Sequence, residues 1–367
     1  MILLNPGPVN LHKDVKEALR NAPDMCHRSS IFENLLLETK NKILKLCNAD
    51  NNKYDVIILS GSGTLGVQAM IDSFWIFHSE SSVIVNGEYS CRMFYRLNYV
   101  TNENIKKIIQ SKQFYLDKNS FNDIKNLQYE NVFLVHHDTS TGVLNNIDKI
   151  CKILKNNECR VFIDCTSSFG SEIIDFKKLD IDAISFSSNK CIESIPGCAI
   201  VVYKKELLEK GRQKLVDIDS LYSYSNLNLY KNNKIPFTPN TTSIYVLNKA
   251  LELLINETIN KRNIRYKKLN EYIRKEMINI GFKAVIPQKY NSSSLTSFYI
   301  PKNVDYKEYE KFMEKNDIII YASNFKENIP LYKIAKNQFR IANMGQITEN
   351  HINKFLHITK QYMGSKL

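Results

Sequence analysis

The sequence predicts an α/β protein in which a large domain, built on a mostly parallel sheet with helices on both faces, precedes a smaller α+β domain. Three observations support this fold class. Short, continuous apolar segments alternate with segments of helical periodicity over most of the chain, as in parallel sheets that are buried on both faces. After about residue 258, a long basic amphipathic segment and further short strands replace that alternation. The 367 residues also exceed the length of one ordinary compact core.

We therefore expect an N-terminal arm (residues 1–13), a large domain (14–258) and a small C-terminal domain (259–367). The chain starts with an apolar segment and then turns at Pro6-Gly7-Pro8. Because this turn follows so few residues, we interpret the first segment as an arm rather than as part of a core.

Periodicity predicts the individual elements in chain order. In the large domain, the predicted strands are short and apolar and span residues 55–60, 82–86, 131–136, 160–164, 182–186 and 198–203. The predicted helices span 11–20, 30–46 and 147–156, and another follows the glycine-rich turn at 61–66 and runs through Phe77. In the small domain we expect helices at 261–280 and 306–315 and strands at 283–286, 294–300, 318–320 and 338–341.

Composition narrows the class of partner. The formal charge of +12 would suit nucleic acid, but the lysines are dispersed among Asn and Ile, and no basic run is interleaved with aromatic residues. We expect a solvated basic surface with no nucleic-acid partner, whose positive field suits a small anionic substrate. The eight cysteines form no C-x-x-C pair, so no metal site is expected. With no signal peptide and no membrane-length apolar run, we expect a cytoplasmic protein that does not enter a membrane.

Parallel α/β sheets bind ligands at the carboxyl ends of their strands, so the residues that follow each predicted strand are candidates for a site. The segment SGSGTLG follows strand 55–60 and contains Ser62, Gly63 and Thr64. Its N–H groups and hydroxyls would stand at a helix N-terminus, where a phosphate is favoured. The segment lacks a P-loop lysine and does not match G-x-G-x-x-G, so a plain helix cap explains it equally well in isolation.

Two further strand ends carry aromatic and hydroxyl side chains. Tyr89 is expected in a loop after strand 82–86, where its ring could stack on a flat cofactor, although ordinary packing is the more common role of such a tyrosine. Thr139 follows strand 131–136 in HHDTSTG. Hydroxyls in such a segment also cap the next helix, which is the alternative interpretation.

A carboxylate and a lysine complete the series. Asp164 ends an apolar strand, so its carboxylate is partly desolvated and needs a cationic or hydrogen-bonding partner; an N-cap is the alternative. Lys190 follows the next strand, in SSNKCIESIPG. In a dry pocket its amine would have a lowered pKa and would attack a carbonyl carbon, whereas most lysines simply extend into solvent.

Together these residues predict a binding site for pyridoxal 5′-phosphate. Its phosphate needs N–H groups and hydroxyls, its ring a flat neighbour, its pyridine nitrogen a carboxylate and its aldehyde a lysine. The sequence places these four features in this order at successive strand ends.

The motifs resemble those of the class V aminotransferase family over nearly the whole chain. The segments that carry the resemblance are LLNPGPV, DMCHRSSIF, LSGSGTLGVQAM, NGEYSCRM, HHDTSTGVLN, IDCTSSFG, SSNKCIESIPG, FTPNTTS and FRIANMG. The resemblance implies aminotransferase fold type I, with a mostly parallel seven-stranded sheet.

The resemblance also implies a role for each matching residue near the cofactor ring. Lys190 would bind the cofactor covalently and move the substrate's proton. Asp164 would pair with the pyridine nitrogen, and Thr139 would bind the ring hydroxyl. Tyr89 would stack on one face of the ring, with Thr166 near the other face.

Other matching residues are expected to bind anionic groups. Ser62, Gly63 and Thr64 would bind the cofactor phosphate, and Thr238 would reach it from a second subunit, which implies a homodimer with a shared site. Arg340 would bind the acidic group of the substrate, because its planar fork matches carboxylate and phosphonate oxygens.

Within the family, the sequence resembles most the branch that transfers the amino group of 2-aminoethylphosphonate to pyruvate, giving phosphonoacetaldehyde and L-alanine. Tyr321-Ala322-Ser323 replaces the Tyr-Pro-Gly that is frequent in the family, so serine–pyruvate and alanine–glyoxylate transamination stay open. A desulfurase would need a cysteine on a mobile loop, and Cys191 beside Lys190 is badly placed for that role. The non-enzyme alternative is a basic nucleic-acid-binding or scaffold protein.

Overall fold

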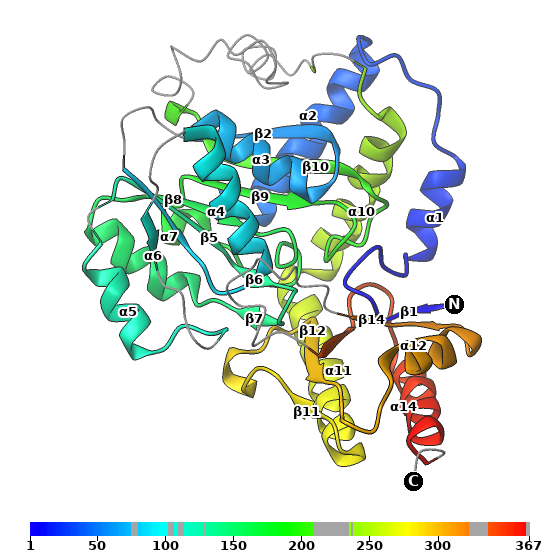
Figure 1. Cartoon of the computed structure of the whole chain (residues 1–367). Coiled ribbons are helices and arrows are strands. Elements are labelled where there is room, and N and C mark those ends of the chain that lie inside the picture. Colours follow the sequence, from blue (N-terminus) through cyan, green and yellow to red (C-terminus); the bar gives the residue numbers. More distant parts are fainter. Residues whose placement is uncertain are drawn as a thin grey trace.

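The computed structural model describes residues 1–74, 80–101, 106–108, 114–127, 129–207, 235, 238–322 and 337–364. Its main feature is a seven-stranded sheet in the order β2-β10-β9-β8-β5-β3-β4 (Figure 1). The strands are β2 (Tyr54–Gly61), β3 (Ser81–Ile84), β4 (Lys106–Ile108), β5 (Asn131–Val135), β8 (Arg160–Asp164), β9 (Ala183–Ser187) and β10 (Gly197–Lys204). Only β10 runs antiparallel to its neighbours, so the predicted mostly parallel, seven-stranded sheet is confirmed.

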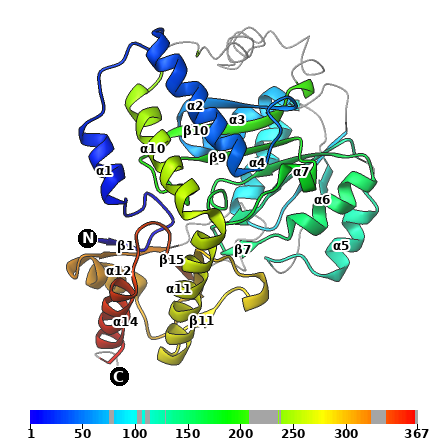
Figure 2. The same ribbon diagram turned by 180° about the vertical axis from the view of Figure 1, so that it is seen from behind.

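Helices cover both faces of this sheet because alternate strand residues are apolar on each side. In β2, Val56 and Ile58 pack in one core cluster, whereas Ile57 and Leu59 pack in another. The first cluster includes residues of α2 (Ser30–Leu46), α6 (Ile147–Asn156) and α10 (Thr241–Glu257), and Figure 2 shows α2 and α10 on that face. The second includes residues of α3 (Gly63–Phe74) and α4 (Glu88–Thr101).

A second, four-stranded antiparallel sheet lies in the C-terminal part of the chain, in the order β11-β12-β15-β14. Its strands are β11 (Lys283–Ala284), β12 (Leu295–Tyr299), β14 (Tyr321–Ala322) and β15 (Gln338–Ala342). The helices of this part are α11 (Ile259–Ile280), α12 (Tyr306–Lys315) and α14 (Glu349–Gly364), and they contribute to one core cluster with the sheet. The division of the chain at residues 258 and 259 stays a prediction; α10 ends at Glu257 and α11 begins at Ile259.

Smaller elements complete the described chain. The helices are α1 (Lys13–Arg20), α5 (Lys118–Lys125) and α7 (Phe176–Leu179), with a 3-10 turn at Gln288–Tyr290. The strands β6 (His137–Asp138) and β7 (Val143–Leu144) form a hairpin-like antiparallel pair. None of the helices in these described ranges is long and apolar enough to cross a bilayer.

The structure differs from the predictions at the N-terminus. Strand β1 (Ile2–Leu3) pairs in parallel with β13 (Ile318–Ile319), and Ile2 and Leu4 are buried in the core of the C-terminal part. Figure 1 shows this N-terminal strand beside the C-terminal helices. The prediction that the first segment takes no part in a core is therefore wrong, because the apolar residues that precede the turn at Pro6 gain a partner strand from the other end of the chain.

Helix boundaries agree closely with periodicity where a helix was predicted. Helix α2 has the predicted bounds, with the Ser29 hydroxyl accepting the N–H of Phe32 as its N-cap. Helix α3 is described to Phe74, so the predicted continuation through residue 77 lies outside the described residues. Helix α4 was not predicted, and Tyr89 lies in its first turn rather than in a loop.

Candidate active site

A cavity of about 250 Å³ lies at the carboxyl ends of β2, β8 and β9. It brings together seven of the ten predicted site residues, which are distant in sequence but lie at or after the carboxyl ends of strands of one sheet. The residues that line it are Ser62, Gly63, Thr64, Val67, Gln68, Tyr89, Arg92, Met93, Arg96, Asp164, Thr166, Ser187, Asn189 and Lys190.

Lys190 is held between the cavity and the N-terminal segment. Its Nζ atom donates a hydrogen bond to the backbone carbonyl oxygen of Pro6. The next residue, Gly7, has a φ of +128°, and a Cβ atom there would lie 2.7 Å from Cδ of Lys190. Burial, together with the positive charge of Arg340, lowers the pKa of Lys190 to about 8. About a tenth of this amine is therefore neutral, and nucleophilic, at pH 7.

Asp164 faces the same cavity from the end of β8. Its side chain is almost fully buried, and Oδ1 accepts the N–H of Thr166 at 2.8 Å. Burial raises the pKa of Asp164 to about 6, although the hydrogen bonds from Thr166 oppose that rise. The carboxylate is thus charged at neutral pH but would gain from a cationic partner in the cavity.

The glycine-rich turn forms one wall of the cavity. Strand β2 ends at Gly61 and α3 begins at Gly63, so Ser62 lies at the helix N-terminus, where backbone N–H groups are free to bind an anion. A Cβ atom on Gly63 would lie 2.7 Å from Cγ2 of Thr166. Only glycine allows the turn to approach Thr166 this closely.

Tyr89 reaches the cavity from the first turn of α4, and a buried carboxylate holds that turn. Oδ2 of Asp138 accepts the N–H groups of Tyr89 at 3.1 Å and of Ser90 at 3.4 Å, and Oδ1 accepts the N–H of Ser140 at 3.0 Å. On the ring of Tyr89, the guanidinium carbon of Arg92 lies 5.1 Å from the ring centroid. Asp138 therefore positions the backbone of Tyr89, and the guanidinium group of Arg92 contacts its ring.

Thr139 and Arg340 contact each other but do not line the cavity. Arg340 donates from Nη1 to the carbonyl oxygen of Thr139 at 3.0 Å and from Nη2 to that of Ala322 at 2.8 Å. Its guanidinium carbon lies 4.8 Å from the ring centroid of Tyr321, and Nε has no partner among the described residues. Arg340 is buried in β15, close enough to Lys190 to affect its pKa.

The structure does not bring Thr238 to the cavity. Thr238 is exposed, although the backbone N–H of nearby Asn240 donates to the hydroxyl of Ser60 at the end of β2. Ser323, which departs from the family pattern, lies outside the described residues. In the described ranges, no cluster of His, Cys, Asp and Glu side chains could bind a metal ion.

Sequence reasoning missed several side chains that line the cavity. Gln68 lies one helical turn after Thr64, and Arg92 and Arg96 lie three and seven residues after Tyr89. These spacings place each of them on the same helix face as a predicted site residue. The helical spacing could have identified Gln68, because a helix was predicted there. Arg92 and Arg96 could be found only by recognising that Tyr89 lies at the start of a helix.

Comparisons with known proteins identify the family of this chain. Residues 12–325 match the model of the family Aminotransferase class-V. Over 364 residues, the chain is 30% identical to 2-aminoethylphosphonate–pyruvate transaminase of Bacillus cereus, covering 97% of this chain and 96% of that protein. It is 28% identical over 372 residues to the bifunctional phosphonoacetaldehyde hydrolase/aminoethylphosphonate transaminase of Clostridioides difficile, covering 99% of this chain and 56% of that protein.

Solved structures show the same fold. Alanine–glyoxylate aminotransferase from Nostoc sp. superposes with a TM-score of 0.86 at 21% identity, covering 98% of this chain and 94% of that chain. Pyridoxamine–pyruvate aminotransferase from Mesorhizobium loti superposes with a TM-score of 0.86 at 20% identity, covering 100% and 92%. The fold is therefore aminotransferase fold type I, and the chain is an aminotransferase that belongs to the class V family.

Proposed function

We propose that this aminotransferase uses pyridoxal 5′-phosphate to transfer the amino group of 2-aminoethylphosphonate to pyruvate, giving phosphonoacetaldehyde and L-alanine. The observation that carries the proposal is that a buried lysine, Lys190, and a buried carboxylate, Asp164, line one cavity beside the helix N-terminus at Ser62. The choice of substrates is supported by relatives whose names specify 2-aminoethylphosphonate and which align over nearly the whole chain.

The residues that line the cavity fit the cofactor. Ser187 contributes a buried hydroxyl with no partner among the described residues, and the turn at Ser62 offers N–H groups to a phosphate. Ser62, Gly63 and Thr64 would hold the phosphate, Tyr89 and Thr166 the faces of the ring, Asp164 its nitrogen and Lys190 its aldehyde carbon. Thr139, which does not line the cavity, would bind the ring hydroxyl. When bound, the cofactor supplies a carbonyl that accepts the amino group and a ring that withdraws electrons.

Lys190 and Asp164 divide the acid–base work of this reaction. Lys190 takes a proton from the carbon that bears the amino group of the donor, and it delivers a proton to the carbon that receives the amino group in the acceptor. A lysine with a pKa of about 8 suits this role, because it gains and loses protons readily near neutral pH. Asp164 remains a carboxylate above its pKa of about 6, so it can keep the ring nitrogen protonated.

Arg340 would recognise the acidic group of either substrate. Two backbone carbonyl oxygens hold its Nη atoms, those of Thr139 and Ala322, and so fix the plane of the guanidinium group. Phosphonate and carboxylate both offer oxygens that suit a guanidinium donor. Thr238 is exposed in one chain, so we propose that it completes the phosphate site of a second copy in a homodimer.

Spectroscopy and a donor assay test the proposal. Protein incubated with pyridoxal 5′-phosphate should gain a visible absorbance band, and borohydride should then trap the cofactor on Lys190, as detected by peptide mass. Lys190→Ala should lose this attachment, and the exposed-lysine control Lys178→Ala should keep it. With pyruvate as acceptor, 2-aminoethylphosphonate should yield alanine. Alanine from serine but not from 2-aminoethylphosphonate would contradict the substrate assignment, and a protein that stays colourless would contradict the enzyme itself.

A further inference from the structure

The loop that joins β9 to β10 contains Lys190 and, three residues later, a second buried charge. The side chain of Glu193 is 3% exposed, and its backbone has a φ of 63°, a left-handed conformation that costs free energy in residues other than glycine. The loop closes on itself, since the N–H of Glu193 donates to the carbonyl oxygen of Lys190 at 2.9 Å. A change in the position of Glu193 therefore acts directly on the backbone of Lys190.

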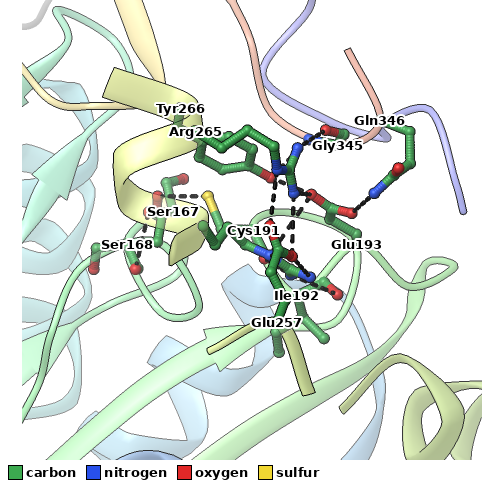
Figure 3. A network of polar contacts seen from close by, with 12 residues as sticks. Ser167, Ser168, Cys191, Ile192, Glu193, Glu257, Arg265, Tyr266, Gly345 and Gln346 are labelled. Carbon is green, nitrogen blue, oxygen red and sulfur yellow. Dashed lines mark hydrogen bonds and ion pairs between the residues drawn. The ribbon is translucent and has the colours of Figure 1, made fainter. Parts of the chain in front are cut away.

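The side chain of Glu193 points toward Arg265, Tyr266 and Gln346, in the C-terminal part of the chain (Figure 3). Oε1 accepts the hydroxyl of Tyr266 at 2.6 Å and Nη2 of Arg265 at 2.9 Å. Oε2 accepts the side-chain amide of Gln346. Tyr266 is fully buried, and Arg265 and Gln346 are partly buried, so the carboxylate exchanges water for protein donors on both oxygens.

Arg262 holds the same loop by its backbone. Its Nη1 donates to the carbonyl oxygen of Cys191 at 2.8 Å and to that of Ile192 at 3.4 Å. Arg262 and Arg265 also share Glu257, at 2.7 Å and 2.8 Å. Two arginines and two glutamates thus form a compact network in which the formal charges balance. This balance matters most for Glu193 and Arg262, whose side chains are each 3% exposed.

The network connects three parts of the chain whose relative positions matter for the proposed function: the loop that contains Lys190, the junction of α10 and α11, and the segment that follows β15. Glu257 is the last residue of α10, and Arg262, Arg265 and Tyr266 lie in the first turns of α11. The hydroxyl of Tyr266 also accepts the N–H of Gly345 at 2.8 Å. Gly345 follows β15, the strand that contains Arg340.

We propose that Glu193 and Arg262 are positioning residues, which fix the loop of Lys190 relative to the strand of Arg340. The role rests on the proposed function, because it concerns the lysine that binds the cofactor and the arginine that binds the substrate. The network sets the distance between the two ends of one substrate: the carbon where Lys190 moves a proton and the acidic group that Arg340 holds. Neither positioning residue lines the cavity, so each acts through the backbone rather than on the reacting atoms.

The test compares two variants of Glu193 with a matched control. Glu193→Gln keeps the shape of the side chain and removes its charge. Glu193→Gly removes the carboxylate but relieves the left-handed backbone. The control is Asp182→Asn, which neutralises another buried carboxylate with two lysine partners, Lys155 and Lys204, next to the opposite end of β9. A change in the thermal stability of any of the three variants does not decide the test, which rests on the two readouts below.

The first readout needs no cofactor. In amide hydrogen exchange, the N–H groups of Glu193 and Ser194, which bond to the carbonyl oxygens of Lys190 and Ser188, should exchange at least about tenfold faster in both Glu193 variants. Asp182→Asn should leave them unchanged. Wild-type exchange rates in Glu193→Gly would overturn the proposal, because the backbone alone would then hold the loop.

The second readout reports on Lys190 itself. Circular dichroism in the visible band of the bound cofactor depends on the geometry of its lysine linkage, so its amplitude should change in the Glu193 variants and not in Asp182→Asn, at temperatures well below unfolding. An unchanged signal in Glu193→Gln would overturn the positioning role. A wild-type protein with no such signal would instead overturn the proposed function, while the exchange comparison would still decide whether Glu193 orders the loop.

Discussion

The Nζ atom of Lys190 donates a hydrogen bond to the backbone carbonyl oxygen of Pro6, 184 residues earlier in the chain. The N-terminal segment therefore forms part of the wall around the candidate catalytic lysine. This contact places Gly7 against the lysine side chain, and it gives the buried amine a hydrogen-bond acceptor in the described structure.

Gly7→Ala should impair attachment of the cofactor more than it impairs folding. The new Cβ atom would lie 2.7 Å from Cδ of Lys190, so the lysine must move. A suitable control is Gly281→Ala, because Gly281 also has a positive φ, +109°, but a Cβ atom there meets nothing within 4 Å. Both variants should lose roughly 1 kcal/mol of stability from the left-handed backbone. Only Gly7→Ala should slow borohydride-trappable attachment; equal rates in the two variants would contradict the contact.

The lowered pKa of Lys190 predicts a pH-dependent gain in stability for Lys190→Met without cofactor. The native lysine binds fewer protons than the unfolded one between a pKa of about 8 and its ordinary value of 10.5, so wild-type stability rises with pH across that window. Lys190→Met lacks this pH-dependent contribution to the free energy of unfolding. Its stability relative to wild type should be greatest below pH 8, by up to about 3 kcal/mol, and should decline toward pH 10.5.

Chemical denaturation of both proteins across this pH range measures the difference, and pH-independent packing effects cancel in the comparison. Lys178→Met is the control of opposite sign. The hydrogen bond that Lys178 donates to Asp148 raises the pKa of Lys178, so its contribution to stability is present at neutral pH and is lost as the pH rises. A relative stability of Lys190→Met that does not vary between pH 7 and pH 10 would show that Lys190 titrates normally.

Asp138→Asn should weaken cofactor binding through Tyr89. One oxygen of the amide cannot accept all of the N–H groups that the carboxylate accepts from Tyr89, Ser90 and Ser140, and the amide N–H₂ would face donors. Because Asp138 is fully buried, the loss of stability should be about 1–3 kcal/mol.

The matched control for this helix cap is Asp117→Asn. Asp117 caps α5, where its Oδ1 accepts the N–H of Ser120 at 2.9 Å, but it lies outside the cavity, and asparagine is as good an N-cap as aspartate. Asp117→Asn should therefore change neither stability nor the dissociation constant of the cofactor. If Asp138→Asn also binds the cofactor normally in a spectroscopic titration, Asp138 has no part in positioning Tyr89.

Arg340→Lys should lower kcat/KM for both anionic substrates by about 10- to 100-fold. A lysine cannot reproduce the two bonds to the carbonyl oxygens of Thr139 and Ala322 while still offering a planar fork to the substrate. Arg274→Lys is the control, since Arg274 also donates to a backbone carbonyl oxygen, that of Ile286, away from the cavity. Steady-state kinetics that show the same loss in both variants would indicate a general effect of replacing an arginine that donates to a backbone carbonyl oxygen.

Much of the candidate site could be predicted because parallel strands bring their carboxyl ends to one edge. Asp164 and Lys190 follow β8 and β9, which are neighbours in the sheet, so recognising the two strands was enough to place both side chains together. Ser62 follows β2, which β10 separates from β9, and the shared edge again brings it to the cavity. Tyr89 was placed at this edge correctly, but as a loop residue, because helix α4, in whose first turn it lies, was not recognised.

The sequence by itself determined every strand of the large sheet except β4, the order of the chemical groups at the strand ends and the family to which those groups point, because each of these depends on residues close together in the chain. Only the tertiary structure decided that Ile2 pairs with Ile318, that Pro6 contacts Lys190 and that Arg340 contacts Thr139. It also decided that Glu193, an unremarkable residue in its loop, is bound by Arg265 and Tyr266. Such contacts join distant segments, and the packing of the whole chain selects them; no local pattern encodes them.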